Sequence, residues 1–142
     1  MSSAGPVEAP AARPGAGARV LYVEDHPPDV ALMADYLSGF EDLSLAVASS
    51  IDQAIELAAK IRPAVVLVDL DWLADRASTG LLARLRALPT MRAAQVIGLS
   101  NSADPKTRAF SRHLGCDRFF TKPLDLSALG DALGEMLPTA AA

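Results

Sequence analysis

The 142-residue chain lacks several features that would each indicate a particular class of protein. Its single cysteine excludes an intrachain disulfide bond and fits a reducing compartment. No apolar run is long enough to span a membrane, and the chain does not begin with a secretory signal. With 13 basic residues against 17 acidic ones, its charge gives no reason to expect direct nucleic-acid binding. We therefore expect a cytoplasmic protein without membrane contact.

Aromatic residues are also scarce, at 5% of the chain, whereas 51% of the residues are hydrophobic. This composition is typical of an α/β protein rich in Ala, Leu and Val, and the length suits one domain. Residues 1–18 are mostly Ala, Pro, Gly and Ser, which predicts a disordered tail. We expect the folded domain over 19–138, a frayed end over 139–142, and no output domain after it.

Apolar strand-like runs alternate with helical patterns between these ends. The predicted strands are Arg19–Val23, Leu43–Ala48, Ala64–Val68, Gln95–Leu99 and Arg118–Phe120. The predicted helices are Pro27–Gly39, a segment from Ser50 to before Pro63, Thr79–Leu88, a segment from Pro105 to Gly115, and Leu126–Leu137. This alternation predicts a five-stranded parallel sheet with helices on both faces, joined by right-handed crossovers.

Polar residues lie where four of the apolar strand-like runs end. They are Glu24, Asp25, Asp69, Ser100 and Lys122. Strand ends in a parallel sheet meet along one edge, where such folds bind their ligands. Three carboxylates, a hydroxyl and an ammonium at one edge are suited to holding a hard divalent cation and a phosphoryl group.

The motifs VLYVEDHPPD, VVLVDLD, VIGLSNSADP and FFTKPLD carry these residues in a fixed order. In order and spacing they resemble the receiver domain of two-component response regulators, and in particular a stand-alone, chemotaxis-regulator-like receiver. The resemblance covers about Arg19 to Leu137. It implies the flavodoxin-like (βα)5 receiver fold.

The resemblance also implies a phosphorylation site. Asp69 would accept a phosphoryl group from a histidine kinase or a phosphotransfer protein. Glu24, Asp25, Asp69 and the backbone carbonyl of Asp71 would hold Mg²⁺, and Lys122 would neutralise phosphoryl oxygens. Such a protein is a switch in a phosphorelay and not an enzyme, beyond Mg²⁺-dependent self-phosphorylation and autodephosphorylation.

Ser100 and Phe119 would form the switch that the family uses. The hydroxyl would turn to the phosphoryl oxygen, and the aromatic ring would turn inward. Phe119 as an ordinary core aromatic is an equally open interpretation. The signal would reach a downstream protein effector through the face formed by the helix after Pro105, the strand 118–120 and the last helix. Residues on that face include Lys106, Arg108 and Arg112, and the family also allows a homodimer through it.

The segment after Asp69 departs from the family pattern. It reads LDWLADRASTG, so that Gly80 comes late and Leu73 replaces the usual proline. We interpret it as an extended loop, carrying Trp72, Asp75 and Arg76, that either covers the site or is a tolerated insertion.

Further departures and candidates lie near the site. The Asp71 side chain would add negative charge beside the phosphoryl group. Asn101 replaces a small residue, which predicts a longer-lived phosphorylated state. His26 is expected to be a surface histidine, since Mg²⁺ prefers oxygen ligands. His113 is expected near the carbonyls that end its helix, and Cys116 is expected to be structural.

Two other functions are alternatives to the receiver. A phosphorylation-independent receiver-like scaffold remains open, since the extended segment and Asp71 are unusual. A flavodoxin-type cofactor carrier would have a Ser/Thr/Gly-rich phosphate loop after the first strand, where this chain has the acidic sequence EDHPPD. Glycine-rich dinucleotide-binding motifs are also absent from the sequence.

Overall fold

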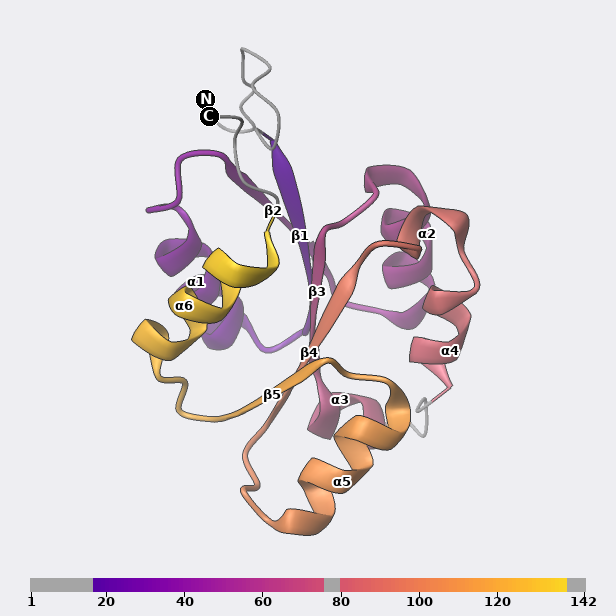
Figure 1. The fold of residues 1–142 in the computed structure, drawn as a ribbon, viewed down its shortest axis with the longest axis vertical. Coiled ribbons are helices and arrows are strands. Elements are labelled where there is room, and N and C mark those ends of the chain that lie inside the picture. Colours follow the sequence, from indigo (N-terminus) through magenta and orange to yellow (C-terminus); the bar gives the residue numbers. More distant parts are fainter. Residues whose placement is uncertain (1–16, 76–79, 138–142) are drawn as a thin grey trace.

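One parallel sheet organises the part of the chain that the computed structural model describes, residues 17–75 and 80–137. Its strands are β1 (Ala18–Val23), β2 (Leu43–Ala48), β3 (Val65–Asp69), β4 (Gln95–Ser100) and β5 (Arg118–Thr121). They lie in the order β2-β1-β3-β4-β5 (Figure 1). The chain winds first to one side of β1 and then to the other, so the order reverses between β1 and β3. Ligands of such sheets bind at this reversal, outside the carboxyl ends of the strands.

Helices cover both faces of the sheet, as predicted (Figure 1). Within the described residues they are α1 (Pro27–Leu37), α2 (Ile51–Ile61), α3 (Leu70–Asp75), α4 (Leu81–Arg86), the 3₁₀ helix η1 (Pro89–Met91), α5 (Pro105–Leu114) and α6 (Leu126–Met136). None of them is long and apolar enough to cross a membrane.

The central strands are apolar on both faces because helices pack against each of them. Val66 and Val68 of β3 belong to a core beneath α2, α3 and α4, while Val65 and Leu67 belong to a second core beneath α1 and α6. All four side chains are fully buried. This explains why the sequence of β3 is a continuous apolar run and not an alternating one.

Local sequence signals fix the helix ends. Ser50 accepts a hydrogen bond from the Gln53 amide at the start of α2, as the predicted cap requires. The Gln53 side chain, however, accepts from the amide of Ser49 and not from that of Ser50. Gly115 ends α5 with φ of 99°, a left-handed conformation that glycine adopts without strain.

The largest correction to the sequence-based prediction concerns the segment after Asp69. We predicted an extended loop there, and this prediction is wrong: Leu70–Asp75 forms α3. The helix forms because Leu70, Trp72 and Leu73 bury their side chains in the core beneath α2 and α4. The Asp69 side chain also accepts a hydrogen bond from the Trp72 amide, in the manner of a helix cap.

Other boundaries differ by a few residues. β1 begins at Ala18, within the predicted tail, and β3 includes Asp69. The helix predicted over 79–88 is shorter, Leu81–Arg86, because Pro89 starts the separate turn η1. The predictions for 1–16, for Arg76 and Thr79 in the segment 76–79, and for the frayed end 139–142 lie outside the described residues.

Gly98, in the middle of β4, lies where three side chains converge. A methyl group added there would come within 2.9 Å of Ser111 Oγ, 3.0 Å of Cys116 Sγ and 3.0 Å of Leu70 Cδ1. We therefore expect Gly98→Ala to lower the free energy of unfolding by about 1–3 kcal/mol, the usual cost of overpacking.

The matched control is Gly134→Ala in α6, where an added methyl group meets no atom within 4 Å. Alanine should stabilise this helix by about 0.5–1 kcal/mol, because it loses less backbone entropy on folding. Urea unfolding of both variants tests the pair. If Gly98→Ala were as stable as the parent protein, the three side chains around Gly98 would not be packed as tightly as the structure indicates.

Candidate functional site

The carboxyl edge of the sheet brings together most of the polar residues that the sequence singles out. Glu24 follows β1, Asp69 ends β3, Ser100 ends β4, and Lys122 follows β5. Glu24, Asp69 and Ser100 are buried, with exposed fractions of 3%, 4% and 0%. Buried polar side chains of this kind need partners close by.

Lys122 is the partner that the buried carboxylates share. Its Nζ lies 3.3 Å from Glu24 Oε1 and 3.2 Å from Asp29 Oδ2, and it also hydrogen-bonds Asp69 Oδ2. The lysine side chain is only 14% exposed. The amide of Lys122 donates to the Ser100 carbonyl at 2.8 Å, which fixes the backbone from which this side chain reaches across the edge.

Glu24 is held by groups of its own loop as well. Its Oε2 accepts from the amides of Asp25 at 3.2 Å and His26 at 3.3 Å. Its Oε1 accepts from the Tyr22 hydroxyl at 3.4 Å. Burial, followed by the charge of Glu24, raises the pKa of Tyr22, so this hydroxyl remains a donor at neutral pH.

The two buried carboxyl groups differ in proton affinity. Burial raises the pKa of Glu24, and its hydrogen bond with Asp69 raises it further. Burial also acts to raise the pKa of Asp69, but its hydrogen bonds with Glu24 and Lys122 outweigh this effect, and the pKa lies below its usual value. Burial lowers the pKa of Lys122, yet its bond to Asp69 prevails and the pKa is raised. Asp69 is therefore ionised and Lys122 charged at neutral pH.

A possible metal site lies among these carboxylates. Glu24, Asp29 and Asp69 each offer one oxygen, and the three oxygens lie within 4.8 Å of one another. Carboxylate oxygens so placed have the chemistry that Mg²⁺ prefers. Our sequence reasoning missed Asp29, in the first turn of α1, because an acidic residue there is also a common helix-start signal. Asp25 is exposed on the wall of the same cavity.

The cavity above this group has a volume of about 670 Å³ and is open to solvent. It is lined by Glu24, Asp25, His26, Asp29, Asp69, Asp71, Trp72, Asp75, Asn101, Lys122 and Pro123. His26 is an exposed histidine, as predicted, and its Nδ1 lies 3.3 Å from Asp29 Oδ2. Most of the lining side chains are thus acidic, and Lys122 contributes an ammonium group.

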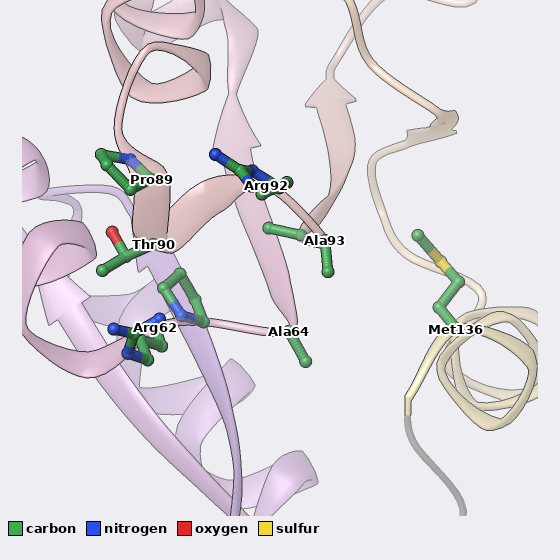
Figure 2. A pocket seen from close by; sticks show the side chains of 9 residues that line it. Arg62, Ala64, Pro89, Thr90, Arg92, Ala93 and Met136 are labelled. Carbon is green, nitrogen blue, oxygen red and sulfur yellow. The ribbon is translucent and has the colours of Figure 1, made fainter.

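A second cavity, of about 570 Å³, lies near the opposite edge of the sheet, where β3 and β4 begin. Figure 2 shows the side chains that line it, which are Arg62, Pro63, Ala64, Pro89, Thr90, Arg92, Ala93, Ala94 and Met136. None of these lining residues carries a carboxylate. This cavity therefore cannot supply the oxygen ligands that the first one offers.

Asp71, on the first turn of α3, contacts the end of β4 through its side chain. Its Oδ1 accepts from the Ser100 hydroxyl at 2.8 Å, and its Oδ2 accepts from the Asn101 amide at 2.8 Å and from Asn101 Nδ2 at 3.1 Å. The carbonyls of an α-helix point along its axis toward the C-terminal end. The metal contact that the resemblance implies for the Asp71 carbonyl would therefore come from a residue in the first turn of α3.

Phe119 lies on β5 with its side chain against the core beneath α2 and α4, while its neighbour Phe120 packs on the opposite face. Phe119 is half-buried, and the guanidinium of Arg108 from α5 lies 5.1 Å from the centre of its ring. Two residues further along α5, Phe110 is 37% exposed. The predicted signalling face thus carries both cationic and aromatic side chains.

The remaining candidates are placed as expected. His113 lies in the last turn of α5. Cys116 is buried with 8% exposure, and burial raises the pKa of its thiol. A buried thiol with a raised pKa is a poor nucleophile, so the structural interpretation of Cys116 holds.

Comparison with known proteins identifies this constellation. The response regulator receiver domain family model matches residues 20–134. The signal receiver domain of a DNA-binding response regulator from Colwellia psychrerythraea is 20% identical with a TM-score of 0.74, covering 83% of this chain and 96% of that one. A chemotaxis response regulator of Vibrio cholerae is 18% identical with a TM-score of 0.73, covering 84% and 98%.

A third similar structure bears on the metal. The receiver domain of a sensor histidine kinase from Pseudomonas aeruginosa is 23% identical with a TM-score of 0.70, covering 85% of this chain and 98% of that one. That structure is described with a magnesium ion coordinated in its active site cleft. At these identities the solved structures show the fold alone. Comparison with curated proteins gives no match.

Because the Lys122 ammonium contacts several carboxylates, we expect its removal to lower the free energy of unfolding by an amount that depends on pH. At pH 7, Lys122→Met should lower the free energy of unfolding by about 2–4 kcal/mol, since it leaves buried carboxylates uncompensated. The pKa of Asp69 is lower in the folded protein than in the unfolded chain. The ionised Asp69 therefore stabilises the fold fully above the ordinary aspartate pKa, which is about 4, and this stabilisation is lost as the pH falls through the folded pKa. The cost of the substitution should therefore shrink in acid.

Urea unfolding at pH 7 and pH 3.5, followed by the fluorescence of Trp72, measures this cost. Lys60→Met is the control, because Lys60 is 69% exposed and lies 4.0 Å from Glu56, and exposed pairs contribute little. An equal loss at both pH values would show that Lys122 acts through packing and not through charge.

Proposed function

Because a family model matches residues 20–134, the chain belongs to the response regulator receiver domain family, and we propose that it accepts a phosphoryl group on Asp69. The donor would be a histidine kinase or a phosphotransfer protein of a two-component system, and Mg²⁺ would be required. The observation that carries the proposal is the ionised Asp69 carboxylate held beside Lys122 in an open acidic cavity.

The chemistry follows from the groups at Asp69. The Trp72 amide occupies Oδ1, so Oδ2, which contacts Lys122, is the oxygen that attacks the phosphorus. The bond between phosphorus and the donor's leaving group breaks, and its electron pair leaves with that group. Lys122 then neutralises charge on the transferred oxygens. Bound Mg²⁺ would supply further positive charge at those oxygens, held by Glu24, Asp25, Asp29 and Asp69.

The proposed output is a change in protein contacts on the face formed by α5, β5 and α6. Ser100 and Phe119 would couple this face to Asp69, and a downstream protein effector would read it. Arg108 over the Phe119 ring supports a protein-binding surface there, since aromatic and arginine side chains are typical of such surfaces. Homodimerisation would use the same face.

A receiver-like binding module that works without phosphate is the second candidate. One observation favours it: the Ser100 hydroxyl, which the first proposal assigns to a phosphoryl oxygen, is already hydrogen-bonded to Asp71. In this alternative the face of α5, β5 and α6 would have one state only. Phosphorylation then separates the two candidates.

Incubation with acetyl phosphate and Mg²⁺, followed by intact-mass measurement, tests the phosphoacceptor directly. We expect one phosphoryl adduct that requires Mg²⁺ and is absent from Asp69→Asn. Asp131→Asn, an exposed change on α6, serves as the matched control and should retain the adduct. If acetyl phosphate gives no adduct and a purified histidine kinase also fails to phosphorylate the wild type, the binding-module candidate is favoured.

The metal ligands are tested by Mg²⁺ titration of the Trp72 fluorescence, because this single tryptophan lines the cavity. Asp29→Asn and Asp25→Asn should each weaken Mg²⁺ binding by about tenfold, as expected when one carboxylate charge is removed near a divalent ion. Asp131→Asn should not change it. An unaltered dissociation constant for Asp29→Asn would leave the sequence-predicted set Glu24, Asp25 and Asp69 as the carboxylate ligands.

A further inference from the structure

The side chain of Asp71 occupies the hydrogen-bond donors at the end of β4. The Ser100 hydroxyl and the Asn101 amide both donate to this carboxylate at 2.8 Å, and Asn101 Nδ2 adds a third bond at 3.1 Å. Ser100 is fully buried, and its Oγ in turn accepts from the Ser102 amide at 3.0 Å. The hydroxyl is thus fixed in orientation from both sides.

A hydroxyl group has one proton to donate. While that proton is bonded to Asp71, it is not available to another anion at Asp69. The same holds for the Asn101 backbone N–H, which has a single hydrogen. A phosphoryl group on Asp69 and the Asp71 carboxylate would therefore compete for the same two donors, and as like charges they would also repel each other.

The position of Asp71 is set by the fold and not by a mobile loop. Its neighbours Leu70, Trp72 and Leu73 are buried, with 2%, 5% and 0% exposure, and they anchor α3 against the core. The Trp72 amide ties the same helix to Asp69. Asp71, between these anchors, is held facing Ser100.

We propose that Asp71 is an internal anion that holds the Ser100 and Asn101 donors before phosphorylation, so that a phosphoryl group on Asp69 must displace it. This proposal rests on the proposed function, since it describes the regulation of the same site. It assigns to Asp71 the role of a positioning residue that slows phosphorylation and holds the switch hydroxyl when no phosphate is present.

The first measurement needs no phosphate. Asn101 is exposed, so its amide is protected from hydrogen exchange chiefly by the bond to Asp71. In the full chain, Asp71→Ala should speed exchange of the Asn101 amide at least tenfold, whereas Asp71→Asn, which retains a carbonyl acceptor, should speed it less. Unchanged exchange in Asp71→Ala would overturn the proposal.

The second measurement is the rate of adduct formation with acetyl phosphate and Mg²⁺. Asp71→Ala should be phosphorylated at least fivefold faster than wild type. The matched control is Asp75→Ala, which removes the same charge from the same helix and cavity wall but none of the three hydrogen bonds. Asp71→Ala should be phosphorylated at least twofold faster than Asp75→Ala.

The outcomes separate the two proposals. Equal acceleration by Asp71→Ala and Asp75→Ala would overturn the role of the hydrogen bonds and leave only a charge effect. Faster Asn101 exchange together with no adduct in any variant, with either acetyl phosphate or a kinase, would overturn the phosphoacceptor function and with it the competition. Faster exchange with selective acceleration by Asp71→Ala would support both.

Discussion

The contact between the Lys122 ammonium and the carboxylates at the edge of the sheet is the interaction on which the rest of the site depends. Glu24 and Asp69 are almost fully buried, and two such charges would repel each other without a cation between them. Lys122 reaches both of them and Asp29 as well. The ammonium compensates their charge within the chain and so stabilises this carboxylate group in the fold.

This contact in turn depends on the strand order. β1 and β3 are neighbours, so Glu24 and Asp69 meet wherever those strands end. β5 lies at the far edge of the sheet, beyond β4, and a long side chain is needed to cross that distance. The Lys122 amide, bonded to the Ser100 carbonyl, anchors the start of that side chain. A fold with a different strand order would separate these four residues.

The sequence predicts the sheet and most of the edge because both follow from local patterns. Apolar runs define the strands, and polar residues that end parallel strands must meet. Asp29 was not predicted, since its approach to Lys122 depends on how α1 leaves the strand edge. The helix α3 was missed because six residues carry too little periodicity, and burial of Leu70, Trp72 and Leu73 stabilises it only in the folded core. The contact of Asp71 with Ser100 depends on that helix.

The helix α3 therefore does more than replace a loop. At its start, the Trp72 amide binds Asp69 Oδ1, and one residue earlier the Asp71 side chain binds Ser100 and Asn101. A short helix with three side chains packed in the core transmits a displacement along its length, because close-packed interiors have low compressibility. A new group on Asp69 that weakens its bond to the Trp72 amide would therefore also disturb the bonds of Asp71. The residue that receives the phosphoryl group in our proposal and the hydroxyl that reports it are thus connected through one turn of backbone.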